Sequence, residues 1–205
     1  MLLTINSENP QARLIKQAVA ILEKDGVIIY PTDSSYALGC SIQSKKSMRR
    51  IFQIKQLDPK KPLTFICHNT QQFQQYTKGI SNIVFRAIKP NIPGPYTFIF
   101  EASKLVPKAM CSPRSTIGVR IPNANIACLL AEYLDQPILS TSIPLEEDQT
   151  IQEPDHLYEK YQKRIDCMIS SGDIYCRQSA MIDFTKAEPE IIRAGDANLD
   201  WLNLG

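Results

Sequence analysis

Short hydroxyl side chains recur where apolar, strand-like runs of this 205-residue chain begin or end. Residues alternate between the two faces of a strand, so every second hydroxyl would lie on one face of a sheet. A hydroxyl can both donate and accept a hydrogen bond, which suits phosphate, carboxylate and ribose oxygens. The positions concerned are Thr32, Ser34, Thr64, Thr116, Ser140, Thr141 and Ser142.

The segment Pro-Thr-Asp-Ser-Ser, residues 31–35, follows the apolar run Val27–Tyr30. Pro31 should end that strand because proline cannot donate a ladder hydrogen bond. Two interpretations of the polar residues stay open. They form a solvated turn, or they form the edge of a ligand site at a strand end, where α/β folds place their ligands.

Two arginines lie in strand-like surroundings. Arg120 lies within TIGVRIP, and a cation in an apolar strand needs an anionic partner. That partner is either a ligand or a structural carboxylate, and the residues favour neither interpretation. Arg193 in IIRAG poses the same choice, with Gly195 permitting close approach of the backbone.

Several kinds of chemistry find no support in the sequence. It has no G-x-x-x-x-G-K-[ST] and no G-x-G-x-x-G segment. With two histidines, a Ser-His-Asp site or a zinc site is not expected, and we assign no metal ligand. The six scattered cysteines indicate small core residues in a reducing compartment.

Charge and hydropathy narrow the class of protein further. A net charge of +2 allows a nucleic-acid surface only as a local patch. Because the sequence contains no long apolar run and no signal-like N-terminus, we expect a cytoplasmic protein that does not enter a membrane.

The elements that would position these residues alternate between helix and strand. Helices are predicted from an Asn9 cap to Leu22, from a Ser44 cap through Phe52, and over 83–88, 126–134 and 156–165. Strands are predicted over 27–30, 63–67, 96–100, 116–121, 137–142, 167–170, 180–184 and 190–194. This pattern predicts one α/β domain over residues 1–205, with a mixed central sheet and flanking helices.

Six segments together resemble a known family. YPTDSSYALGC, IKQLDPKKPLTFIC, IPGPYTFIF, TIGVRIP, ILSTS and IIRAG occur in the order found in the YrdC/YciO family, and the chain resembles the YciO branch most. The resemblance implies a twisted sheet with a concave, positively charged cavity. It also implies synthesis of threonylcarbamoyl-AMP from ATP, L-threonine and bicarbonate, with Mg²⁺ on the phosphates. The product would serve threonylcarbamoyladenosine formation in tRNA.

The resemblance also implies roles for single residues. The threonine-binding positions would be Thr32, Arg120, Ser142 and Ser179. The nucleotide-binding positions would be Lys55, Lys61, Thr64, Thr116, Ser140 and Arg193. Since alignment and charge neutralisation suffice for this adenylation, we assign no catalytic side chain.

Five positions depart from the pattern of the synthases. Leu57 replaces the arginine of K-x-R, Ile66 lies at or near a histidine position, and Pro144 replaces an asparagine. Lys61 replaces the asparagine before P-L, and Ala180 replaces the threonine that follows the matching serine. A charge-assisted contact of the lost kind is worth roughly 1.5–3 kcal/mol. Lys60 and Lys61 could restore the charge, or belong to a solvated loop. A nucleotide-binding or double-stranded RNA- or tRNA-binding paralogue therefore stays open beside the synthase, as does a hydrolase acting on the adenylate.

Overall fold

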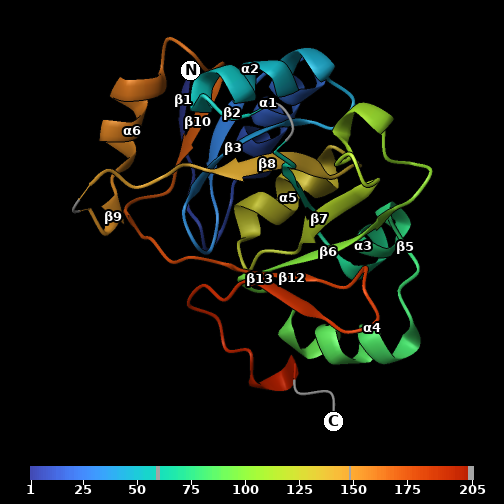
Figure 1. Ribbon diagram of the computed structural model, residues 1–205. Coiled ribbons are helices and arrows are strands. Elements are labelled where there is room, and N and C mark those ends of the chain that lie inside the picture. Colours follow the sequence, from blue (N-terminus) through green and yellow to red (C-terminus); the bar gives the residue numbers. More distant parts are fainter. Residues whose placement is uncertain (59–60, 148, 203–205) are drawn as a thin grey trace.

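A twisted mixed sheet runs through the protein, with helices on both of its faces (Figure 1). The structure is a computed structural model and describes residues 1–58, 61–147 and 149–202. Within that part of the chain, eleven strands form the sheet in the order β1-β10-β2-β3-β8-β4-β7-β6-β12-β13, with β5 pairing beside β6. These strands are β1 Leu2–Thr4, β2 Ile28–Pro31, β3 Tyr36–Ser41, β4 Thr64–Ile66, β5 Thr77–Lys78, β6 Tyr96–Ala102, β7 Thr116–Arg120, β8 Ile138–Ser142, β10 Cys167–Ser170, β12 Ala180–Asp183 and β13 Glu190–Arg193.

The α-helices and a small second sheet cover the main sheet. The helices are α1 Ala12–Glu23, α2 Lys45–Lys55, α3 Thr70–Tyr76, α4 Asn82–Ile88, α5 Asn125–Tyr133 and α6 Pro154–Tyr161. Strands β9 Ile151–Gln152 and β11 Ile174–Tyr175 pair with each other. Short 3-10 helices occupy Lys89–Asn91, Lys108–Met110 and Asp200–Leu202. Among the described residues, no helix has the length and apolar character needed to cross a membrane.

Strand alternation divides the apolar core in two. On one face, Phe65, Phe98 and Leu139 pack with residues of α2, α3, α4 and α6. On the other face, Tyr30 and Ile138 pack with residues of α1 and α5. The remainder of this second face carries hydroxyl groups and glycine at its central strands, and it lines the cavity described below.

Residues 31–35 form the turn of a hairpin, because β2 and β3 pair in antiparallel fashion. The Thr32 hydroxyl donates to the Ser35 carbonyl at 2.7 Å and accepts from the Ser34 and Ser35 backbone amides at 3.2 Å. Such hydroxyl-to-backbone bonds fix a tight turn. The two interpretations of this segment are therefore compatible, since the turn also lines a cavity.

The predicted N-cap residue is right for helix α2 and wrong for helix α1. Ser44 caps α2 as predicted, its hydroxyl accepting from the Ser47 amide at 3.1 Å. The first helix was predicted to begin at Asn9, but Gln11 is its N-cap. The reason is Asn6, whose side-chain oxygen accepts from the amides of Glu8 and Asn9 and holds them in a turn.

Candidate functional site

Nine of the ten residues implicated by sequence line one cavity of about 150 Å³. Its hydroxyls and cations come from the β2–β3 turn, the last residue of α2, the loop before β4, the central strands of the sheet, the residue before β12 and the edge strand β13. The pairing register explains part of this convergence, because Thr64 of β4 lies directly between Ser140 of β8 and Gly118 of β7. The nine are Thr32, Lys55, Lys61, Thr64, Arg120, Ser140, Ser142, Ser179 and Arg193.

Thr116 is the residue that does not join this lining. It lies at the start of β7, opposite Glu101, and alternation places it on the same face as Gly118 and Arg120. Its hydroxyl is 2.6 Å from the Ser112 hydroxyl. Thr116 therefore lies beside a neighbouring pocket that Ser112 lines.

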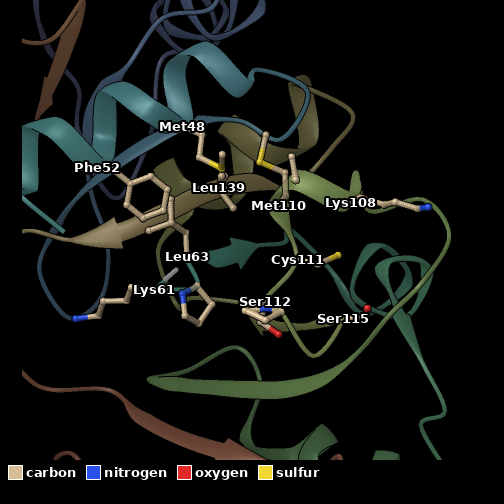
Figure 2. A pocket seen from close by; sticks show the side chains of 13 residues that line it. Met48, Phe52, Lys61, Leu63, Lys108, Met110, Cys111, Ser112, Ser115 and Leu139 are labelled. Carbon is tan, nitrogen blue, oxygen red and sulfur yellow. The ribbon is translucent and has the colours of Figure 1, made fainter. Parts of the chain in front are cut away.

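That neighbouring pocket has a volume of about 560 Å³ and is partly apolar (Figure 2). Figure 2 shows the amino groups of Lys61 and Lys108 pointing away from the apolar side chains. Lys61 and Pro62 line both this pocket and the cavity, so the two adjoin. The apolar lining comprises Met48, Phe52, Leu63, Met110 and Leu139.

A third pocket, of about 320 Å³, extends the cavity on the side of β13. It continues to Leu145, Cys176 and Asp196. Six residues line both spaces, namely Ser34, Ser35, Arg120, Ser142, Ser179 and Arg193. The hydroxyl-rich cavity is thus the middle of a longer polar depression.

Arg120 has a carboxylate partner within the protein. Its Nη2 lies 2.5 Å from Asp33 Oδ1, its Nη1 donates to Ser34 Oγ at 3.0 Å, and its Nε donates to the Gly94 carbonyl at 3.2 Å. Burial lowers the pKa of Arg120, which is 6% exposed, and the Asp33 carboxylate opposes that shift. The structural ion pair is therefore present, and Arg120 also lines the cavity.

Lys55 spans the cavity from the end of α2 to the end of β8. Its ammonium group donates to the Ser142 carbonyl and to Thr141 Oγ1, the latter at 3.3 Å. Burial, and to a lesser extent the charge of Lys61, lower the pKa of Lys55 to about 8. The charge of Lys55 therefore depends on pH within the range of ordinary buffers.

We expect the binding of a nonhydrolysable ATP analogue to weaken as pH rises from 7.5 to 9, because Lys55 loses its proton near pH 8. Calorimetry across that range gives the measurement. Lys55→Arg should bind with little pH dependence, since a guanidinium stays charged throughout. A wild-type affinity that is flat from pH 7.5 to 9 would remove Lys55 from the phosphate site.

Arg193 and Ser179 line the cavity together, and both share the adjoining pocket with Ser34 and Ser35 of the hairpin turn. Arg193 Nε donates to the Ser179 carbonyl at 2.8 Å, and Nη2 donates to Ser179 Oγ at 3.0 Å. Gly195 has a φ of +60°, and a Cβ there would lie 2.3 Å from the Gln178 carbonyl oxygen. The backbone at Gly195 therefore lies close to the backbone of Gln178 and Ser179, as predicted from the glycine. This contact allows the chain to turn behind Arg193.

Ser140 belongs to a buried hydroxyl network under the cavity. The Tyr30 hydroxyl donates to Ser140 Oγ at 2.7 Å, and Ser140 Oγ donates to the Leu38 carbonyl at 3.2 Å. Burial raises the pKa of Tyr30 well above its ordinary value. Tyr30 thus stays a neutral donor that holds the Ser140 hydroxyl in place.

Three of the departures from the synthase pattern place apolar side chains at or near the cavity. Leu57 packs against the apolar core beside α2. Ile66 is buried against the core of α1 and α5 and lines the cavity with an apolar group. Pro144 lines a separate pocket of about 280 Å³ beside α6. Lys60, one of the two lysines considered as replacement charges, lies outside the described residues, whereas Lys61 lines the cavity.

Sequence reasoning missed three polar residues of the site. Ser35 and Thr97 line the cavity, and Asp33 holds Arg120. Thr97 carried a usable signal, because in YTFIF it alternates with Tyr96 and Phe98 and must lie on the opposite face. Asp33 carried none, since a turn aspartate ordinarily binds its own backbone.

The charge of the cavity is positive. Within the described part of the chain, its lining includes four cations and no carboxylate side chain. The described residues also hold no group of three or more His, Cys, Asp or Glu suited to a metal ion. The side chains of this cavity therefore do not fit a dedicated Mg²⁺ site, and a magnesium ion would be held by the phosphates of a ligand and by water.

Together the fold and the cavity define a mixed α/β protein with a basic, hydroxyl-lined cavity. The family model for Sua5, YciO and YrdC, described as "Telomere recombination", matches residues 20–195, and the chain belongs to this family.

Relatives with similar sequences agree with that assignment. YciO of Escherichia coli K12 is 41% identical over 193 residues, covering 93% of each protein. A Haemophilus influenzae protein is 42% identical over 197 residues, covering 95% of each. The threonylcarbamoyl-AMP synthase of Pyrococcus abyssi is 26% identical over 187 residues, which are 91% of this chain and 55% of that one.

Solved structures confirm the YrdC-like fold predicted from sequence. The crystal structure of E. coli YciO matches with a TM-score of 0.89 and 39% identity, covering 98% of both chains. P. abyssi Sua5 complexed with L-threonine matches with a TM-score of 0.85 and 25% identity, covering 95% of this chain and 57% of that one.

Proposed function

We propose that this chain forms L-threonylcarbamoyladenylate from ATP, L-threonine and bicarbonate, for threonylcarbamoyladenosine formation in tRNA. The observation that carries the proposal is the cavity itself, where hydroxyls and cations converge without a carboxylate among the described lining residues. Such a surface suits a ligand rich in anionic oxygens. Similarity to a threonylcarbamoyl-AMP synthase supports the same activity. We expect the reaction to take place in the cytoplasm.

The three adjoining spaces suggest where each substrate part would lie. The phosphates would lie between Lys55 and Arg193. Among the described residues, neither of these cations has a carboxylate oxygen within 4 Å. The adenine, which has flat aromatic faces and hydrogen-bonding groups at its edge, would enter the pocket beside Lys61 and Pro62, near Thr116. The amino-acid carboxylate would lie at Arg120, near Thr32 and Ser179.

The chemistry would proceed without a covalent enzyme intermediate. The threonine amine and bicarbonate form N-carboxy-threonine with loss of water. One oxygen of the new N-carboxylate group then bonds to the α-phosphorus of ATP. At the same time the bond from the α-phosphorus to the oxygen that bridges it to the β-phosphorus breaks, and pyrophosphate leaves. The protein would contribute alignment and neutralisation of the phosphate charge.

A second function is favoured by Leu57. Its partly buried side chain packs against the core, whereas an arginine at this position could present a planar cation to the phosphates. Lysine ammonium groups give point charges, which do not reproduce bidentate binding by arginine. With leucine at position 57, the chain would retain the cavity but have weak or no turnover. It would then be a paralogue that binds a nucleotide, double-stranded RNA or tRNA.

Release of pyrophosphate distinguishes the two functions. We expect release that requires ATP, an amino acid and bicarbonate together, with threonine preferred in a panel of amino acids. Omission of each component in turn is the control. RNA binding that weakens steeply with salt, in protein that releases no pyrophosphate, would favour the paralogue.

A further inference from the structure

Asp33 is the largely buried carboxylate partner of Arg120 and has no role in the chemistry described above. Its Oδ1 accepts from Arg120, and its Oδ2 accepts from the Asn123 amide at 3.1 Å. It thereby joins the β2–β3 turn to the chain that follows β7. The side chains of Asp33 and Arg120 are 13% and 8% exposed, so the pair is shielded from water.

Because of this pairing, the cations of the cavity differ in whether a nearby carboxylate neutralises their charge. Arg120 and Asp33 together carry no net charge, whereas Lys55 and Arg193 have no carboxylate within 4 Å among the described residues. Among the described residues, the cations of the cavity lining that have no such carboxylate partner are therefore Lys55, Lys61 and Arg193, and Arg193 lies close enough to Arg120 for its charge to act on that guanidinium. Arg120 still offers hydrogen bonds, because the three contacts to Asp33, Ser34 and Gly94 use three of its five N–H groups.

We propose that Asp33 is a positioning and selectivity residue: it fixes the Arg120 guanidinium for a zwitterionic amino acid and, by neutralising that cation, weakens the binding of free polyphosphate at Arg120. A neutral Arg120–Asp33 pair attracts a polyanion weakly but still donates to a carboxylate. An Arg120 without its partner would be a fourth cation without a carboxylate partner among the described lining residues, beside Lys55, Lys61 and Arg193, and would bind polyphosphate indiscriminately. The inference rests on the proposed function for the choice of threonine as the amino acid. The expected change in pyrophosphate affinity does not depend on that function.

The test compares two ligands in Asp33→Asn, with calorimetry on inorganic pyrophosphate and on L-threonine separately. We expect pyrophosphate to bind at least about fivefold more tightly than in wild type, because one negative charge is removed beside Arg120. Threonine should bind at least about tenfold more weakly. As a zwitterion it gains nothing from the more positive site, and it loses the guanidinium that Asp33 held in place. A merely structural defect would weaken both ligands.

Two further variants keep the test decisive. Asp173→Asn removes the same charge from an exposed residue that lies across the hairpin turn and does not contact Arg120, so both affinities should stay within twofold of wild type. Asp33→Asn combined with Arg120→Gln should lose the gain in pyrophosphate binding. If Asp33→Asn unfolds too readily for calorimetry, stabilisation by pyrophosphate in thermal melts replaces it, and the melting temperature should rise more than in wild type.

Unchanged or weaker pyrophosphate binding by folded Asp33→Asn overturns the inference. Wild-type protein that binds no threonine would instead count against the proposed function, and the pyrophosphate comparison would still decide the role of Asp33.

Discussion

Replacement of Arg120 by alanine should abolish detectable threonine binding and destabilise the protein by about 3–5 kcal/mol. The stability loss is expected because the buried Asp33 carboxylate loses its cationic partner. The binding loss should exceed about tenfold, the equivalent of one charge-assisted hydrogen bond. ATP should lose less affinity, since its phosphates would lie nearer Lys55 and Arg193. Calorimetry and denaturant unfolding measure the two effects separately.

A double variant separates the structural and ligand-binding roles of Arg120. Arg120→Leu with Asp33→Leu removes both buried charges, so much of the stability should return while threonine binding stays lost. Threonine binding at the wild-type level in folded Arg120→Ala would mean that Arg120 serves only its ion pair with Asp33.

Gly195→Ala should destabilise the protein by about 2–4 kcal/mol and weaken nucleotide binding strongly. The added Cβ would lie 2.3 Å from the Gln178 carbonyl oxygen and 2.7 Å from the Ser179 carbonyl carbon. Relief of that overlap must move the backbone of Ser179, to which Arg193 donates two hydrogen bonds. Chemical denaturation and titration with an ATP analogue give the two readouts.

Gly172→Ala is the matched control for Gly195→Ala. Gly172 also has a positive φ, of +94°, but no atom lies within 4 Å of its Cβ position. Only the conformational cost of about 1–2 kcal/mol applies there, and nucleotide binding should be unaffected. Equal effects of the two substitutions would show that the Gln178 contact is unimportant.

The convergence of distant residues on one cavity could be predicted because strand alternation and strand ends are visible in sequence. Thr64 and Ser140 illustrate this, since each is a hydroxyl in an apolar strand and register places them side by side. Thr97 shows the same signal and was overlooked. The strand order β8-β4-β7, which sets these contacts, depends on long-range pairing that sequence patterns do not reveal.

Other features depend on tertiary packing alone. The hairpin strand Tyr36–Ser41 was missed because all of its residues are buried, so its hydropathy does not alternate. The two-residue strands β9 and β11 are too short for any period to show. The ion pair of Arg120 with Asp33 and the apolar pocket between Phe52 and Met110 arise only when separate elements meet.

The most direct test of the central claim follows the carbon of bicarbonate. Protein incubated with ATP, L-threonine and ¹³C-bicarbonate should yield a product in which the labelled carbon joins threonine to AMP, detected by mass spectrometry. We expect the mass to shift by about one unit relative to unlabelled bicarbonate, as one carbon is incorporated, and the product to be absent when threonine is omitted. AMP-linked threonine without the label, or no adenylate although ATP and threonine both bind, would contradict the proposed synthase.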